Sequence, residues 1–75
     1  MIKLQNIEIN GNTITADVSA VDENKEAKLM YDGDKKEMHI LSGSNDFYGR
    51  SHARRTLAEV LEKKDSRKER TIMWY

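Results

Sequence analysis

The sequence predicts a single small α+β domain, residues 1–75, in which one helix packs on one face of a mostly antiparallel five-stranded sheet. Three observations predict this two-layer sandwich. The first 41 residues alternate apolar and polar side chains between turn signals, residues 51–64 carry one apolar stripe at helical spacing, and a short apolar run follows. The expected order of elements is therefore ββββαβ.

The first two strands are expected to form a hairpin. Residues 2–9 carry two apolar pairs of opposite parity, so we expect a bulge near Gln5 and Asn6 to bring both pairs to one face. Residues 10–12 contain Asn-Gly, which favours a type I′ turn with positive φ at both central residues. The return strand alternates strictly from residue 13 to 21, which predicts one buried and one wet face of the sheet.

Two more strands, the helix and a last strand are expected to complete the fold. Residues 26–31 and 37–41 alternate around a glycine turn at Asp32-Gly33. Ser51 is the expected N-cap of the helix, with Asp46 as the alternative. Residues 71–75 are apolar on both faces, so we expect them to dock in the sheet, beside the first or the fourth strand, or against a second molecule. The expected core comprises Ile2, Leu4, Ile7, Ile9, Ile14, Ala16, Val18, Leu29, Tyr31, Met38, Ile40, Leu57, Val60, Leu61, Ile72 and Trp74.

Charge is divided unevenly along a chain whose net charge is zero. Residues 1–49 carry five Lys and nine Asp or Glu, a net of −4, and residues 50–75 carry eight Lys or Arg and four Asp or Glu, a net of +4. Such asymmetry can indicate an acidic partner or nucleic acid. The simpler interpretation is that the two halves neutralise each other within one fold. The chain has no cysteine and no long apolar run, so we expect a cytoplasmic protein without disulfide, thiolate metal site or membrane span.

The wet face of the sheet and the last strand are the first candidate site. Small polar and apolar residues share this face, and a partner protein or a second copy could cover them. The residues concerned are Thr15, Asp17, Met30, His39 and Leu41 on the sheet, with Met73 and Tyr75 on the last strand. The sequence therefore predicts a non-enzymatic interaction module of unknown process, and it leaves a homodimer open.

The start of the helix is the alternative site. A helix N-terminus repels cations, yet Arg50, His52, Arg54 and Arg55 occur here with no acid before Glu59. Together with Ser44, Asn45 and a base stacked on Tyr48 or Phe47, they could bind a phosphate or nucleic acid. The ordinary interpretation is a solvated helix, with Arg55 paired to Glu59 and Arg54 reaching Asp32 or Asp34.

Metal binding and catalysis are not predicted, and no cofactor is expected. The two histidines, His39 and His52, lie on different elements, and Asp32-Gly33-Asp34 lacks the later ligands of a calcium loop. Ser51 and His52 are neighbours on a helix and point about 100° apart, so they cannot form a nucleophile–base pair.

Overall fold

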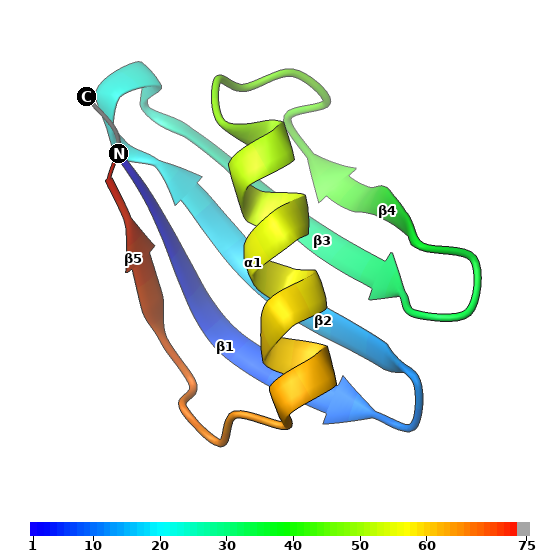
Figure 1. Ribbon diagram of the computed structural model, residues 1–75. Coiled ribbons are helices and arrows are strands. Elements are labelled where there is room, and N and C mark those ends of the chain that lie inside the picture. Colours follow the sequence, from blue (N-terminus) through cyan, green and yellow to red (C-terminus); the bar gives the residue numbers. More distant parts are fainter. Residues whose placement is uncertain (74–75) are drawn as a thin grey trace.

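The computed structural model describes residues 1–73 and contains the predicted order of elements. They are β1 (Ile2–Asn10), β2 (Thr13–Ala20), the short 3₁₀ helix η1 (Val21–Glu23), β3 (Lys25–Asp32), β4 (Glu37–Gly43), α1 (Arg50–Lys63) and β5 (Arg70–Ile72). The strands form one sheet in the order β4-β3-β2-β1-β5, in which every neighbouring pair is antiparallel (Figure 1). The last strand therefore lies beside β1, at an edge of the sheet.

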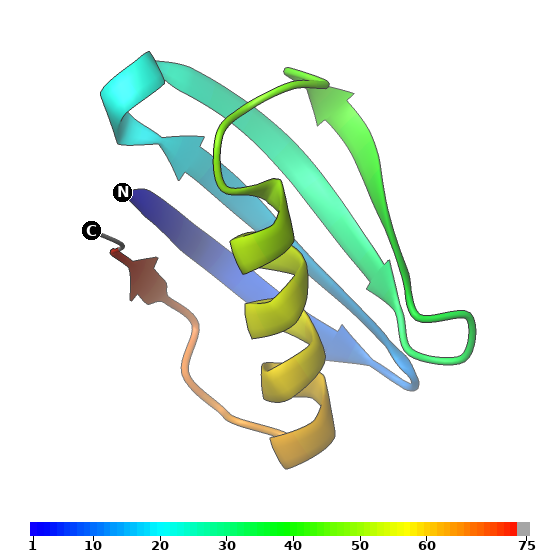
Figure 2. The same ribbon diagram turned by 45° about the horizontal axis from the view of Figure 1, so that its top comes forward.

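The helix crosses a single face of the sheet, which confirms the predicted two-layer α+β fold (Figure 2). Its buried residues are Ala53, Leu57, Val60 and Leu61, which recur at helical spacing and face the strands. No other helix or strand of residues 1–73 lies on the opposite face of the sheet.

The predicted bulge in β1 is confirmed. The register between β1 and β2 shifts between Gln5 and Glu8, and Asn6 has a positive φ of 53°. The extra residue turns Ile7 to the buried face that Ile2 and Leu4 also occupy.

The turn that follows differs from the prediction. Asn10 pairs with Thr13, so the central residues of the hairpin are Gly11 and Asn12, and only Gly11 has positive φ, at 64°. The predicted type I′ turn is therefore wrong. Positive φ at the first central residue alone is the pattern of type II′ turns, which favour glycine at that place.

The turn between β3 and β4 also uses its glycine differently. The left-handed residue is Lys36, with φ 57°, and not Gly33. Gly33 instead permits close packing, because an added Cβ would lie 2.8 Å from Leu61 Cδ2 and 2.9 Å from the Asn12 carbonyl oxygen. The Gly33 N–H donates to that carbonyl at 2.8 Å, so the two hairpin ends are held together beside the end of α1.

The helix begins one residue earlier than predicted. Gly49 is its N-cap, with φ 102° and no side-chain capping hydrogen bond, so neither Ser51 nor Asp46 caps the helix. At the other end, Lys64 adopts a left-handed conformation and the Asp65 N–H donates to the Val60 carbonyl at 3.1 Å. These C-terminal bonds satisfy carbonyls that the helix leaves without partners.

The core lies between the helix and the sheet, and most of its predicted residues are buried. Met38, Ile40 and Ile72 are only partly buried, because they lie on the edge strands β4 and β5. Ile9 is 37 % exposed, which corrects its assignment to the core: β5 pairs with β1 only as far as Leu4, so β1 has one neighbour at Ile9. Phe47 joins the core, and the predicted core residue Trp74 lies outside the described residues.

Candidate interaction surfaces

The open face of the sheet carries the polar residues that alternation predicted. Across the strands, Thr15 of β2 faces Met30 of β3, which faces His39 of β4. In the next row Asp17 of β2 faces Lys28 of β3. The five predicted sheet residues therefore belong to three adjacent strands.

Leu41 is the most exposed apolar side chain of these strands. The register between β3 and β4 shifts between Lys28 and Leu29, which makes Leu41 an extra residue on the edge strand β4. Its side chain is 51 % exposed, whereas Met30 is half-buried. A bulge on an edge strand discourages pairing with a further strand, so this edge favours contact through side chains.

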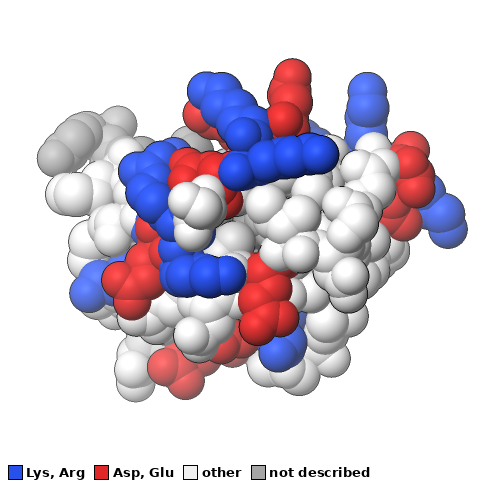
Figure 3. Space-filling model, turned by 90° about the horizontal axis from the view of Figure 1, so that it is seen from below, with Lys and Arg blue, Asp and Glu red and all other residues white. Residues whose placement is uncertain are grey.

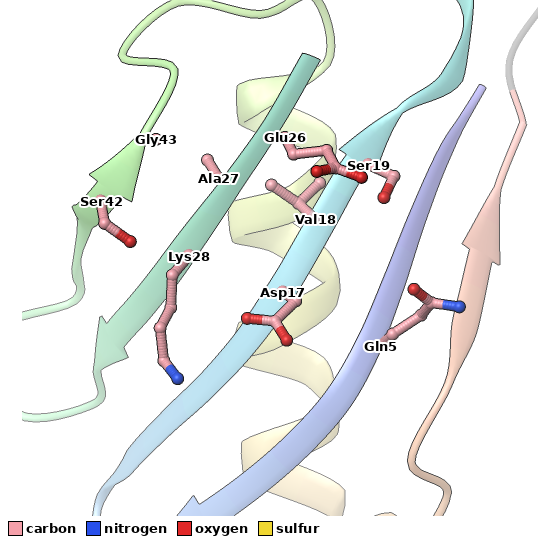
Figure 4. Close-up of a pocket in the computed structure, with 9 residues that line it drawn as sticks. All are labelled: Gln5, Asp17, Val18, Ser19, Glu26, Ala27, Lys28, Ser42 and Gly43. Carbon is pink, nitrogen blue, oxygen red and sulfur yellow. The ribbon is translucent and has the colours of Figure 1, made fainter. Parts of the chain in front are cut away.

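A hollow of about 450 Å³ lies in this face, and we call it the sheet-face hollow. Its lining comes from four neighbouring strands, with α1 behind the sheet (Figure 4). The lining residues are Gln5, Asp17, Val18, Ser19, Glu26, Ala27, Lys28, Ser42 and Gly43. Two carboxylates, one ammonium and neutral polar groups make this a site for polar or cationic side chains of a partner.

Local structure holds the sheet-face hollow in shape. In the bulge of β1, Asn6 donates from Nδ2 to Asp17 Oδ2 at 2.8 Å. Gly43 has φ 88°, and an added Cβ would collide with the Glu26 carbonyl oxygen and lie 2.7 Å from Ala27 Cα. Of this lining, alternation along the strands predicts Asp17, Ser19 and Lys28 on the open face. The bulge at Leu41 and the close approach of Gly43 to β3 beside this hollow were not predicted, because alternation within one strand does not fix them.

The predicted C-terminal part of the surface is described as far as residue 73. Thr71 of β5 faces Lys3 of β1, and Met73 is 58 % exposed just after the strand. The structure thus places Met73 at the edge of the sheet away from Leu41 of β4. Tyr75, which was predicted to belong to this surface, lies outside the described residues.

The arginines at the start of α1 are only partly brought together. Arg50 and Arg54 line a hollow of about 310 Å³ with Ser51 and Met38. Arg55 follows Arg54 and projects about 100° away around the helix. Within residues 1–73 no ion pair joins any of these arginines to an acid.

The two predicted neutralising contacts are not formed. Glu59 pairs with Lys63 at 3.1 Å and not with Arg55, and the hydrogen bond from Lys63 lowers the pKa of Glu59. No ion pair joins Arg54 to Asp32 or Asp34. Asp32 accepts hydrogen bonds from the backbone of its own turn, and Asp34 accepts one from Asn12 Nδ2.

Several polar groups of the loop before the helix form hydrogen bonds within the protein. The Ser44 N–H donates to the Glu26 carbonyl at 2.9 Å, and its hydroxyl donates to the Asp46 carbonyl at 3.0 Å. The Tyr48 N–H donates to Glu23 Oε2 at 2.7 Å, which places a carboxylate from η1 beside the start of the helix. The loop amides at residues 44 and 48 are thus not available to a phosphate.

The remaining members of the predicted anion site lie apart. Tyr48 is 66 % exposed and lines a separate hollow of about 250 Å³ with Met1 and Ala20. His52 is half-buried in the first turn of the helix, and Asn45 is exposed in the loop. Phe47 is buried in the core, so it cannot stack on a base.

The charged connection between α1 and β5 forms its own ion pairs. Arg67 donates to Asp65, with Nη2 to Oδ2 at 2.7 Å, and this lowers the pKa of Asp65 to about 2. Arg70 reaches the same carboxylate at 3.5 Å. Cations and carboxylates are interspersed over this end of the molecule (Figure 3), which suits a solvated surface better than a phosphate track.

Two further classes of site receive no support in residues 1–73. No group of three or more histidine, aspartate or glutamate side chains in this part of the chain is placed to hold a metal ion. No described helix has the length and apolar character needed to cross a membrane.

Comparison with protein-family models, with curated proteins and with solved structures finds no match to this chain.

Proposed function

We propose that this chain is a protein-interaction module without catalytic activity, which binds its partner through the open face of its sheet. The observation that carries the proposal is the uncovered face itself: a five-stranded sheet has its only described α-helix on one side. The other side carries the polar sheet-face hollow, and exposed Leu41 precedes Ser42, one of its lining residues. An apolar residue in a polar surround is typical of interfaces that form and separate.

The edge of the sheet extends this surface. β5 is three residues long, lies at the edge of the sheet and is followed by exposed Met73. An edge strand presents backbone N–H and C=O groups that can pair with a strand of a partner. The proposal includes a cytoplasmic location, with which the absence of cysteine is compatible.

Position-specific crosslinking tests the proposal. We would introduce p-benzoylphenylalanine in place of Leu41 and, as a matched control, in place of Glu62, which is exposed on α1. Irradiation in extracts of the source cells should give discrete adducts from position 41 and none from position 62. Adducts of equal yield from both positions, or from position 62 alone, would show that the sheet face is not the binding surface.

A phosphate or nucleic-acid site at the start of α1 is the second candidate function. The observation in its favour is that Arg50 and Arg54 line one hollow and have no acidic partner within residues 1–73. The bonded amides of the preceding loop count against it. Oligonucleotide binding here would weaken steeply with salt, because phosphate contacts release counterions.

A further inference from the structure

Many charged side chains have no ion-pair partner in the described part of the chain, and two sets of them, one acidic and one basic, line hollows of the surface. The first set is Asp17 and Glu26, whose carboxylates line the sheet-face hollow. The second set is Arg50 and Arg54, which share one side of α1 because they are four residues apart. None of these four side chains takes part in an ion pair within residues 1–73.

The acidic and basic halves of the chain do not neutralise each other by contact. Among the described residues, two ion pairs and a contact of His39 with Glu37 lie within residues 1–49, and three ion pairs lie within residues 50–75. No ion pair joins one range to the other, so the charges of the two halves balance over the whole fold and not through direct contacts. The opposite charges of the two halves remain available to other molecules.

The fold keeps the two sets on opposite sides. α1 lies against one face of the sheet, and the hollow with Asp17 and Glu26 opens on the other face (Figure 4). One chain therefore cannot bring its own arginines to its own hollow. A second copy can.

We propose that the chain associates head to tail, with Arg50 and Arg54 of one copy bound by Asp17 and Glu26 of the next. The proposal rests on the proposed function, because it fills the same open face, and it names the partner as a second copy. Each contact joins two different surfaces, so every added copy leaves one hollow and one pair of arginines free.

The chemistry of the two surfaces is complementary. A guanidinium presents a planar fork of N–H donors, which matches the two oxygens of a carboxylate. The hollow also offers the side-chain oxygens of Gln5, Ser19 and Ser42 as acceptors. Lys28 is the only cation in its lining.

The charge distribution also selects this arrangement over a symmetric one. Two sheet faces in contact would bring the carboxylates of both copies together, and two helices would bring the arginines together. A head-to-tail contact avoids both juxtapositions. The net charge of zero adds no overall repulsion between copies.

Two variants of the full chain, each lacking one of the two proposed surfaces, test head-to-tail association. D17N/E26Q removes the acidic surface while Asn at position 17 can still accept the hydrogen bond from Asn6, and R50Q/R54Q removes the basic surface. Sedimentation velocity at low salt, from about 20 μM to about 1 mM, should show growth of the wild-type chain with concentration. Each variant alone should associate about tenfold more weakly or not at all. Their mixture should form a 1:1 heterodimer and nothing larger, because only one intact pair of surfaces remains.

Matched variants control for the change in net charge. E62Q/E69Q alters the charge by the same amount as D17N/E26Q, and K35Q/K68Q matches R50Q/R54Q, and both pairs change residues outside the two surfaces. Both controls should associate like the wild-type chain. Amide spectra of all variants establish that each is folded.

Three outcomes would overturn the proposal. A wild-type chain that stays monomeric at about 1 mM, or a mixture that forms no heterodimer, excludes head-to-tail association. An oligonucleotide that binds the monomeric chain through Arg50 and Arg54 would identify these arginines as a phosphate site. If the purified chain stays monomeric while position 41 crosslinks to a different protein, this inference fails and the proposed function stands.

Discussion

Glycines of this chain differ in what they contribute, although their sequence contexts look alike. Gly11 is in an open turn, and an added Cβ would meet nothing within 4 Å. Gly43 has positive φ as well, but its Cα faces the backbone of β3 where the sheet-face hollow begins. Gly11 is therefore favoured only because glycine adopts positive φ easily, whereas Gly43 is also required because no side chain fits beside β3.

Replacing Gly43 with alanine should lower the free energy of unfolding by roughly 2–4 kcal/mol, because the methyl group adds collision with β3 to the cost of positive φ. The matched change Gly11→Ala carries only the conformational cost and should lose about 1 kcal/mol. Urea unfolding followed by circular dichroism measures both losses. Equal losses would mean that β4 shifts freely to make room for the methyl group.

The separate elements show which features alternation can predict. Strand count, the bulge at Asn6, the face of α1 and the wet face of the sheet all follow from local periodicity, and all are confirmed. The turn at Gly11 differs because either Asn10-Gly11 or Gly11-Asn12 can supply its two central residues. The strands pair so that Gly11 and Asn12 are central. The helix starts at Arg50 because chain direction at Gly49, and not a capping side chain, sets that boundary.

The candidate surface was less predictable than the fold. Parity placed Asp17, Met30 and His39 on the open face, and the register between strands confirms their neighbours. The hollow beside Asp17 could not be predicted, because it requires the bulge at Leu41 and the approach of Gly43 to β3. Such features depend on how strands meet, and residue spacing within one strand does not encode that.

The connection from α1 to β5 should make stability depend on pH in acid. Hydrogen bonds from Arg67 lower the pKa of Asp65 to about 2, whereas an unfolded aspartate titrates near 3.9. Between these values the unfolded chain binds more protons than the folded chain, so this contribution to stability is present above about pH 4 and is lost as pH falls towards about 2.

Arg67→Gln should raise the pKa of Asp65 towards its ordinary value, and carbon-detected NMR of the carboxyl group through an acid titration measures it. The stability of that variant should also change less with pH between about 2 and about 4. Lys68→Gln, a neighbouring cation with no contact to Asp65, serves as the control and should leave the titration unaltered. An unchanged Asp65 titration in the Arg67 variant would exclude the ion pair in solution.

At the scale of the whole molecule, two sets of unpaired side chains, one acidic and one basic, lie on different elements and on opposite sides of the sheet. Each described ion pair joins two groups of the same half of the chain, and the arginines of α1 and the carboxylates of the sheet-face hollow lie on opposite sides. Interactions between exposed charges decay over roughly 8–10 Å in physiological salt. Contact between copies is therefore needed for these charges to act on one another.

Salt should accordingly weaken self-association of the wild-type chain. Raising NaCl from about 0.02 M to about 0.5 M shortens the screening length from roughly 20 Å to roughly 4 Å, and the dissociation constant should rise at least about fivefold. Sedimentation equilibrium measures the change. An association driven by Leu41 and other apolar side chains would instead be unchanged or strengthened when sulfate replaces chloride.

The buried core contains no polar or charged residue among residues 1–73, and the ion pairs of this part all lie on the surface. Exposed ion pairs contribute little to stability, so the fold does not depend on the identity of its surface charges. Descendants of this chain can therefore exchange acids and bases on either surface while inheriting the same fold. The binding partner can therefore change in evolution through a few surface substitutions, while the fold stays the same.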